Sequence, residues 1–144
     1  MSGMLLVGEL AGTRIAFDAA DIRSVIEVYT LADVPHAPRH IAGLTAVRSQ
    51  ALTVVDLRAS LGLPALPYQS GAPAAVVARD GHLYALLLDS VDDVNEAQGQ
   101  PVPVPGGYGP GWHRVAAGLV DVGTAPALLM DIDALIAGQP GEPS

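Results

Sequence analysis

The sequence predicts an all-β protein made of antiparallel sheets or small barrels. About ten short apolar segments are separated by turn residues, and only two or three helical turns lie among them. Many short strands joined by turns rich in Gly and Pro are typical of sandwiches and barrels, whereas strands alternating with helices would indicate a parallel nucleotide-binding sheet. The 144 residues are enough for one domain with its own core.

The first half of the chain combines strands with short helical stretches. The expected strands are 4–10, 14–18, 24–28 and 51–57, each a short apolar or alternating run bounded by turn residues. Residues 38–48 are expected to begin as a short helix and then extend. Asp56 is expected to cap a helix that Gly62 and Pro64 end.

The second half contains the clearest hairpin. Residues 74–79 and 83–89 flank Asp80-Gly81, a dipeptide typical of two-residue turns. Further strands are expected at 90–96, 115–122 and 125–131. A terminal helix at 132–138 has Asp131 or Asp133 near its start, and the tail 139–144 is expected to fray.

Composition restricts the partners. All seven basic residues are Arg, and 15 carboxylates bring the net charge to −8. Nucleic acid is not an expected partner, because its binding depends on clustered Lys and Arg. The chain has no Cys, its first residues lack the basic start of a signal peptide, and no apolar run approaches the ~20 residues of a membrane helix. We expect a cytoplasmic protein without direct membrane insertion.

No residue pattern indicates catalysis, a metal or a cofactor. His36 and His40 are four residues apart, but Pro38 between them disfavours a helix, and no third ligand has suitable spacing. Asp92 and Asp93 are adjacent, so on a strand they point to opposite faces and form no convergent acid–base pair. No nucleophile-elbow pattern is present. The chain is therefore expected to be a binding module rather than an enzyme.

One segment resembles a known family. In "AVRSQALTVVDLRASLGLP", a set of residues has the spacing of the CheW family of chemotaxis adaptor proteins: Arg48, Val54, Asp56, Leu57, Arg58, Leu61 and Gly62. On either side, Glu27, Gly43, Asp89 and Val91 match further family positions, and the resemblance spans Leu5 to Ile136. Departures include Ser49, which stands where the family has a Gly that permits positive φ.

The resemblance implies a fold and a function. The expected fold is two five-stranded SH3-like barrels packed together with a few short helices, in one CheW-like domain over 1–144. The lobes are expected at roughly 14–66 and 67–138, with the N-terminal strand between them and the Pro- and Gly-rich stretch near residue 67 as their border. The implied function is non-catalytic. It couples the regulatory domain of a CheA-type histidine kinase to the cytoplasmic tip of a methyl-accepting chemoreceptor, in membrane-associated receptor arrays.

Site residues follow from the same resemblance. The expected receptor-binding groove contains Val25, Glu27, Ile41, Gly43, Leu44, Arg48 and Val54, although plain core positions are the alternative for its apolar members. Glu27 and Arg48 are expected to form a partly buried ion pair that fixes the lobes, with an exposed pair as the alternative. The expected kinase-binding surface contains Val91 and Val94. Two other functions remain open: a CheW-like adaptor of another chemosensory system, such as pilus motility, and an all-β enzyme acting through Asp89, Asp92 or Asp93.

Overall fold

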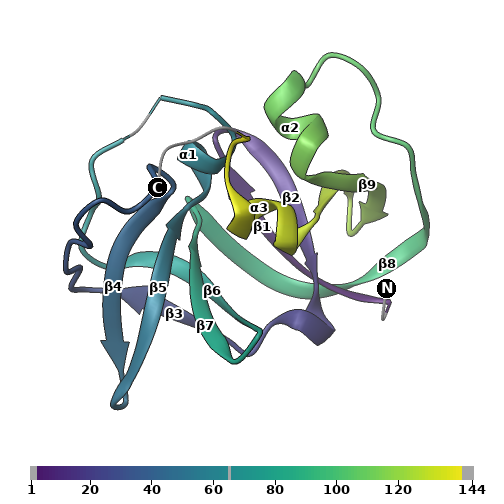
Figure 1. Ribbon diagram of the computed structural model, residues 1–144. Coiled ribbons are helices and arrows are strands. Elements are labelled where there is room, and N and C mark those ends of the chain that lie inside the picture. The colour runs from purple at the N-terminus through teal and green to yellow at the C-terminus, as the bar shows by residue number, and fades with distance from the viewer. Residues whose placement is uncertain (1–2, 65, 141–144) are drawn as a thin grey trace.

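The structure is a computed structural model that describes residues 3–64 and 66–140 (Figure 1). In this part of the chain it contains ten strands, three short α-helices and one 3₁₀ turn. The all-β prediction is confirmed. No helix among the described residues is long and apolar enough to cross a membrane.

Five strands form a closed barrel, which we call barrel A. Its strands follow the order β1–β2–β10–β9–β8: β1 (Met4–Leu10), β2 (Thr13–Asp18), β8 (Ser90–Val102), β9 (Ala116–Val122) and β10 (Ala125–Met130). The 13-residue β8 pairs first with β1 and then with β9, and a short parallel contact between β2 and β10 closes the ring.

The other five strands form a curled sheet, which we call sheet B. Their order is β3–β6–β7–β5–β4: β3 (Ser24–Val28), β4 (Ile41–Val47), β5 (Gln50–Asp56), β6 (Ala72–Arg79) and β7 (His82–Leu87). The central β5 and β7 run parallel, and the other pairs are antiparallel. An isolated bridge between Ala32 and Leu44 connects the loop after β3 to β4. The two five-stranded halves confirm the expected fold class.

The predicted lobe boundary is wrong. Sheet B takes its strands from 24–87, whereas barrel A combines 4–18 with 90–130. The Pro- and Gly-rich stretch near residue 67 therefore connects two parts of sheet B instead of separating the halves. Short hairpins leave hydrogen-bonding edges exposed, and pairing β1 and β2 with distant strands removes those edges.

Buried side chains form three clusters, one of which joins the two halves. One fills barrel A and includes Leu5, Val7 and Val120, and another fills sheet B and includes Val54 and Val76. The largest lies between the halves and is formed by alternate residues of the same strands, such as Leu6, Phe17 and Leu86. Several strands are therefore buried on both faces, which explains why their sequences read as continuous apolar runs.

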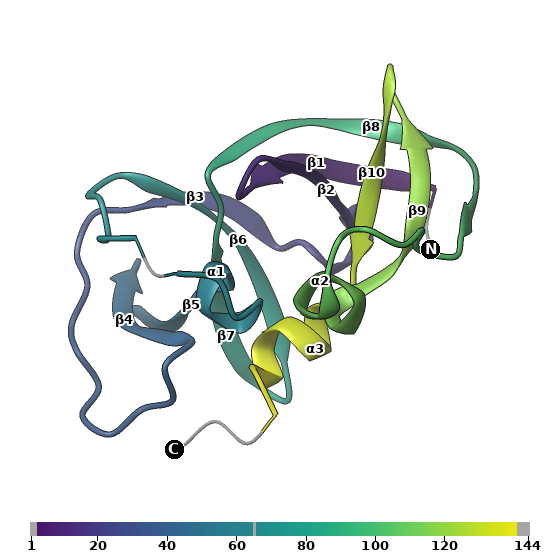
Figure 2. The same cartoon turned by 90° about the horizontal axis from the view of Figure 1, so that it is seen from above.

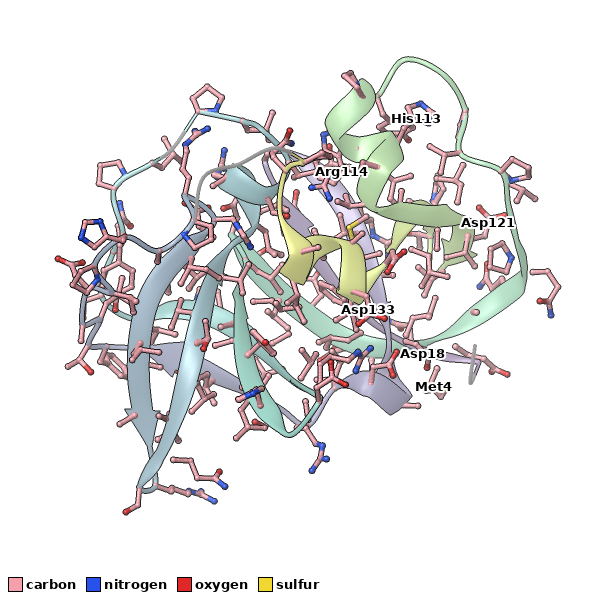
Figure 3. The ribbon with its side chains drawn as sticks, in the orientation of Figure 1. Met4, Asp18, His113, Arg114, Asp121 and Asp133 are labelled. Carbon is pink, nitrogen blue, oxygen red and sulfur yellow. The ribbon has the colours of Figure 1, made fainter. Side chains whose placement is uncertain are left out.

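Three helices lie beside the seam, as Figure 2 shows: α1 (Leu57–Ser60), α2 (Pro110–Val115) and α3 (Ile132–Ala137). Asp56 caps α1 and Asp131 caps α3, as expected: Asp56 accepts the backbone N–H groups of Arg58 and Ala59, and Asp131 accepts that of Ala134. Arg114 extends from α2 toward α3 (Figure 3) and donates to the carbonyl oxygens of Ala134 and Ser60.

Two smaller expectations need correction. No helix forms within 38–48, where the chain makes turns before β4 begins at Ile41. The strand expected at 90–96 is longer than predicted, because β8 continues to Val102. Of the tail predicted to fray, residues 141–144 lie outside the described residues, and the side chain of Gln139 donates to the carbonyl oxygen of Ser60 at 3.1 Å.

Candidate docking surfaces

An apolar groove of about 680 Å³ lies where barrel A meets sheet B. We call it the junction groove. It is lined by side chains and backbone of β1, β3, β6 and β8: Leu6, Val25, Ile26, Glu27, Gly71, Pro73, Asp89, Ser90, Val91, Asp92, Asp93 and Val94. Val25 is 46% exposed and Val94 is 48% exposed, so both sides of the groove present apolar surface to solvent.

The rim of the junction groove is acidic. Its lining residues include the carboxylates of Glu27, Asp89, Asp92 and Asp93 and no basic residue. Glu27 accepts a 2.5 Å hydrogen bond from the hydroxyl of Tyr29. This hydrogen bond, together with the negative charge of Glu27, raises the pKa of Tyr29. An apolar floor with a negative rim suits a partner that brings apolar and basic side chains together.

Asp89 is a charged residue that joins the two halves. Its Oδ2 accepts a 2.7 Å bond from Arg58 of α1 and a 2.8 Å bond from the backbone N–H of Ala11, in the β1–β2 turn. Its own N–H donates to the carbonyl oxygen of Glu9. Asp89 therefore ties the β1–β2 hairpin of barrel A to the end of sheet B, at the edge of the junction groove.

The predicted Glu27–Arg48 ion pair is wrong. Both side chains are exposed, and neither contacts the other within the described part of the chain. Glu27 lies on β3 and Arg48 in the turn between β4 and β5, and these strands are at opposite edges of sheet B. Arg58 pairs instead with Asp89, whose bonds to the backbone of Ala11 and Glu9 reach barrel A.

The remaining members of the expected receptor groove lie elsewhere. Val54 is fully buried inside sheet B, and Ile41 packs partly buried against the shared core. Gly43 is buried too, and a Cβ there would lie 2.5 Å from the carbonyl oxygen of Ala32. Its close backbone approach is therefore internal to the chain. Leu44 is 40% exposed but lines a different hollow.

The structure brings together residues that the sequence assigned to two partners. Val25 and Glu27, expected to contact the receptor, lie in the same groove as Val91 and Val94, expected to contact the kinase. Sequence reasoning missed this because β3 and β8 are separated by more than 60 residues along the chain. The one available indication was that Asp92 and Asp93 stand beside exposed apolar residues on a strand.

The histidines and acidic residues do not form a metal site in the described structure. His40 is buried, and its Nε2 lies 2.7 Å from the carbonyl oxygen of Ile136, whereas His36 is exposed. No group of three or more His, Cys, Asp or Glu is arranged for a metal among residues 3–64 and 66–140.

Comparison with known proteins identifies the family. A family model described as the CheW-like domain matches residues 4–139. The chain belongs to the CheW-like domain family. This CheW-like chain is also similar to the crystal structure of the scaffolding protein TtCheW from Thermoanaerobacter tengcongensis, with a TM-score of 0.74 and 18% sequence identity over 90% of this chain and 89% of that one. That likeness concerns the fold. No curated protein gives a significant match to the sequence.

Proposed function

We propose that this CheW-like protein is a chemotaxis adaptor without catalytic activity. It holds the regulatory domain of a CheA-type histidine kinase and the cytoplasmic tip of a methyl-accepting chemoreceptor, and it works in the cytoplasm at membrane-associated receptor arrays. Family membership supports this proposal. The structural observation that most directly supports the proposal is the junction groove, an exposed apolar surface built from both halves of the fold.

The junction groove suits the receptor tip. The tip is a helical hairpin, and a helix binds a groove through an apolar stripe that repeats every three or four residues. Val25 on one side and Val91 and Val94 on the other provide apolar contacts for such a stripe. Glu27 and the Asp92–Asp93 pair flank these contacts and would orient the helix by charge.

One groove cannot serve two partners at once. A helix seated on Val25 would also cover Val91 and Val94, which line the same groove. We therefore place all four residues Val25, Glu27, Val91 and Val94 in the receptor-binding surface. The kinase then needs a separate surface if one adaptor is to hold both proteins together.

The test compares two exposed valines of the same strand. Val94 is 48% exposed inside the groove, and Val102 is 53% exposed on β8 outside it. Val94→Asp is expected to weaken binding of a labelled receptor-tip fragment at least tenfold, because it places a charge on the apolar floor. Val102→Asp is the matched control. Equal affinities of the two variants would contradict the proposed groove.

The same titration distinguishes the chemosensory systems. Wild-type protein is titrated with the receptor-tip fragment and with the kinase regulatory domain, separately and together, and then with a receptor fragment from a pilus-motility system. Simultaneous binding of receptor tip and kinase supports the chemotaxis adaptor. Binding of the pilus-system fragment alone would assign the protein to that system.

A further inference from the structure

Five of the seven arginines are bonded within the chain. Arg58 and Arg79 pair with carboxylates, and Arg14, Arg39 and Arg114 donate to backbone carbonyl oxygens. The side chains of Arg23 and Arg48 are exposed, and neither forms a hydrogen bond or ion pair within the described structure. In a chain with 15 carboxylates, two arginine side chains without a partner among the described residues are a distinctive feature.

The topology places both arginines at the same end of sheet B. Because β5 and β7 run parallel, the β4–β5 turn with Arg48 and the β6–β7 turn before His82 lie at the same end, as Figure 1 shows. Arg23 directly precedes β3, and its N–H donates to the carbonyl oxygen of Val76, near the end of β6 that leads into the β6–β7 turn.

A hollow of about 540 Å³ lies between these turns. We call it the basic hollow. It is lined by residues of the β4–β5 and β6–β7 hairpins together with one of the two arginines: Arg23, Leu44, Gln50, Ala51, Thr53, Ala78, Gly81, His82 and Leu83. No carboxylate lines it, and Leu44 is 40% exposed at its surface. The junction groove has the opposite charge.

The turn that carries Arg48 is strained. Arg48 has φ +51° and Ser49 has φ +67°, so two residues with side chains occupy the left-handed region that a two-residue hairpin turn requires. Each such residue costs about 1–2 kcal/mol relative to a right-handed conformation. Retained strain at an exposed position is more often associated with function than with stability.

We propose that the basic hollow is a second docking surface, for a protein that presents carboxylates around an apolar side chain. The carboxylates would pair with Arg23 and Arg48, and the apolar side chain would contact Leu44. Arginine suits this role because its planar group binds a carboxylate through two parallel hydrogen bonds. Nucleic acid does not fit, since two arginines and one histidine neutralise few phosphates.

The net charge of −8 does not prevent this contact. At physiological salt the Debye length is about 8 Å, so carboxylates farther away are largely screened. The closest carboxylates along the chain are Asp80, next to Gly81, and Asp21, two residues before Arg23; neither lines the basic hollow, and Asp21 lies 3.8 Å from the guanidinium of Arg79. The local charge at the hollow therefore decides which surface binds there.

The first experiment tests the chemistry of the surface with a peptide probe. The blocked peptide Glu-Glu-Leu-Glu-Glu is titrated into labelled full-length protein, and the arginine Nε–H signals are followed by NMR. We expect the signals of Arg23 and Arg48 and the amide of Leu44 to shift, and the Gln-Gln-Leu-Gln-Gln peptide to leave them unchanged. Shifts no larger than that of Arg39, which is exposed elsewhere, would overturn the proposal.

The second experiment identifies the partner. Arg23→Gln and Arg48→Gln are each expected to weaken binding of one protein fragment, either the kinase regulatory domain or the receptor tip, by about 1.5- to 5-fold and to reduce its salt dependence. Arg39→Gln makes the same charge change and is expected to have no effect. If the variants instead reduce self-association or binding to duplex DNA, the proposed partner class is wrong. Failure of the wild type to bind either fragment would refute the adaptor function, and the peptide titration would still decide this inference.

Discussion

Replacing Gly43 by Ala separates an internal role of this glycine from a role in partner binding. Gly43 lies at a bulge in β4, with φ +154°, and an added Cβ would be 2.5 Å from the carbonyl oxygen of Ala32 and 3.0 Å from the Leu31 side chain. Real Cβ contacts are essentially never shorter than 3.0 Å, so the backbone must move by about half an ångström. The neighbouring bridge between Ala32 and Leu44 would be disturbed.

The expected cost of Gly43→Ala combines three terms. The unfavourable φ costs about 1–3 kcal/mol and the clash about 1–3 kcal/mol, while the lower entropy of the unfolded chain returns about 0.4–1 kcal/mol. The free energy of unfolding should therefore fall by about 1–5.6 kcal/mol, with a central value of about 3.3 kcal/mol. With an unfolding entropy of about 0.3 kcal/mol/K for 144 residues, the melting temperature should fall by about 3–19 °C, with a central value of about 11 °C.

Thermal unfolding followed by circular dichroism measures this effect, and Gly81→Ala is the control. Gly81 has φ +79°, but an added Cβ there meets no atom within 4 Å. The control isolates the conformational term and should lower the melting temperature by only about 2–3 °C. Equal melting temperatures of the two variants would refute the clash. Lost receptor-tip binding with an unchanged melting temperature would show that Gly43 contacts the partner.

Three other predictions follow from single contacts. Arg58 and Asp89 should show a coupling energy of about 0.3–1 kcal/mol in a double-mutant cycle measured by urea unfolding. Because both side chains are partly exposed, 1 M salt should reduce this coupling energy. A coupling energy of zero at low salt would contradict the ion pair. Ser49→Gly should raise the melting temperature by about 2–3 °C, since glycine adopts φ +67° without strain, and a lower value would show that the turn is not strained. Glu27→Gln should lower the pKa of Tyr29 in an absorbance titration, because the hydrogen bond to the Glu27 carboxylate and the charge of that carboxylate raise it; an unchanged titration would mean that the two side chains are not in contact in solution.

The raised pKa of Tyr29 also fixes the sign of a pH effect. A phenol whose pKa is higher in the folded state than in the unfolded state contributes stability at neutral pH, and this contribution is lost as the pH rises through the folded-state value. The contribution therefore disappears only under alkaline conditions. Binding and stability near neutral pH should not depend on this residue's ionisation.

The two docking surfaces differ in chemistry, which gives an adaptor a way to distinguish partners. The junction groove has an acidic rim with exposed valines, and the basic hollow is lined by Arg23 and the exposed Leu44, with Arg48 in the adjoining β4–β5 turn. A partner suited to one surface is repelled by the charges of the other, so charge selects the partner as well as attracting it. Opposite responses to the two sets of charge variants would support this division.

The arrangement of Arg58 and Asp89 illustrates what the sequence could show. Both residues stood out in the resemblance to the family, because they belong to its Asp-Leu-Arg and Val-Asp segments. Their contact did not, since 30 residues of chain separate them; the parallel pairing of β5 with β7, which places Asp56 beside Leu87, brings them within 2.7 Å. The sequence identified the residues, and the pairing of two distant strands brought them together.

The sequence by itself determined the local features of this protein. Apolar alternation, the Asp80-Gly81 turn and the caps at Asp56 and Asp131 depend on neighbouring residues, and the structure contains each of them. Only the tertiary structure decided which strands close barrel A, that Arg48 has no carboxylate partner in the described chain, and that Val25 and Val94 share a groove. The physical reason is that distant strands pair in the arrangement that buries the apolar faces of all strands together. A local sequence pattern describes only one strand and its neighbours, so it cannot predict that arrangement.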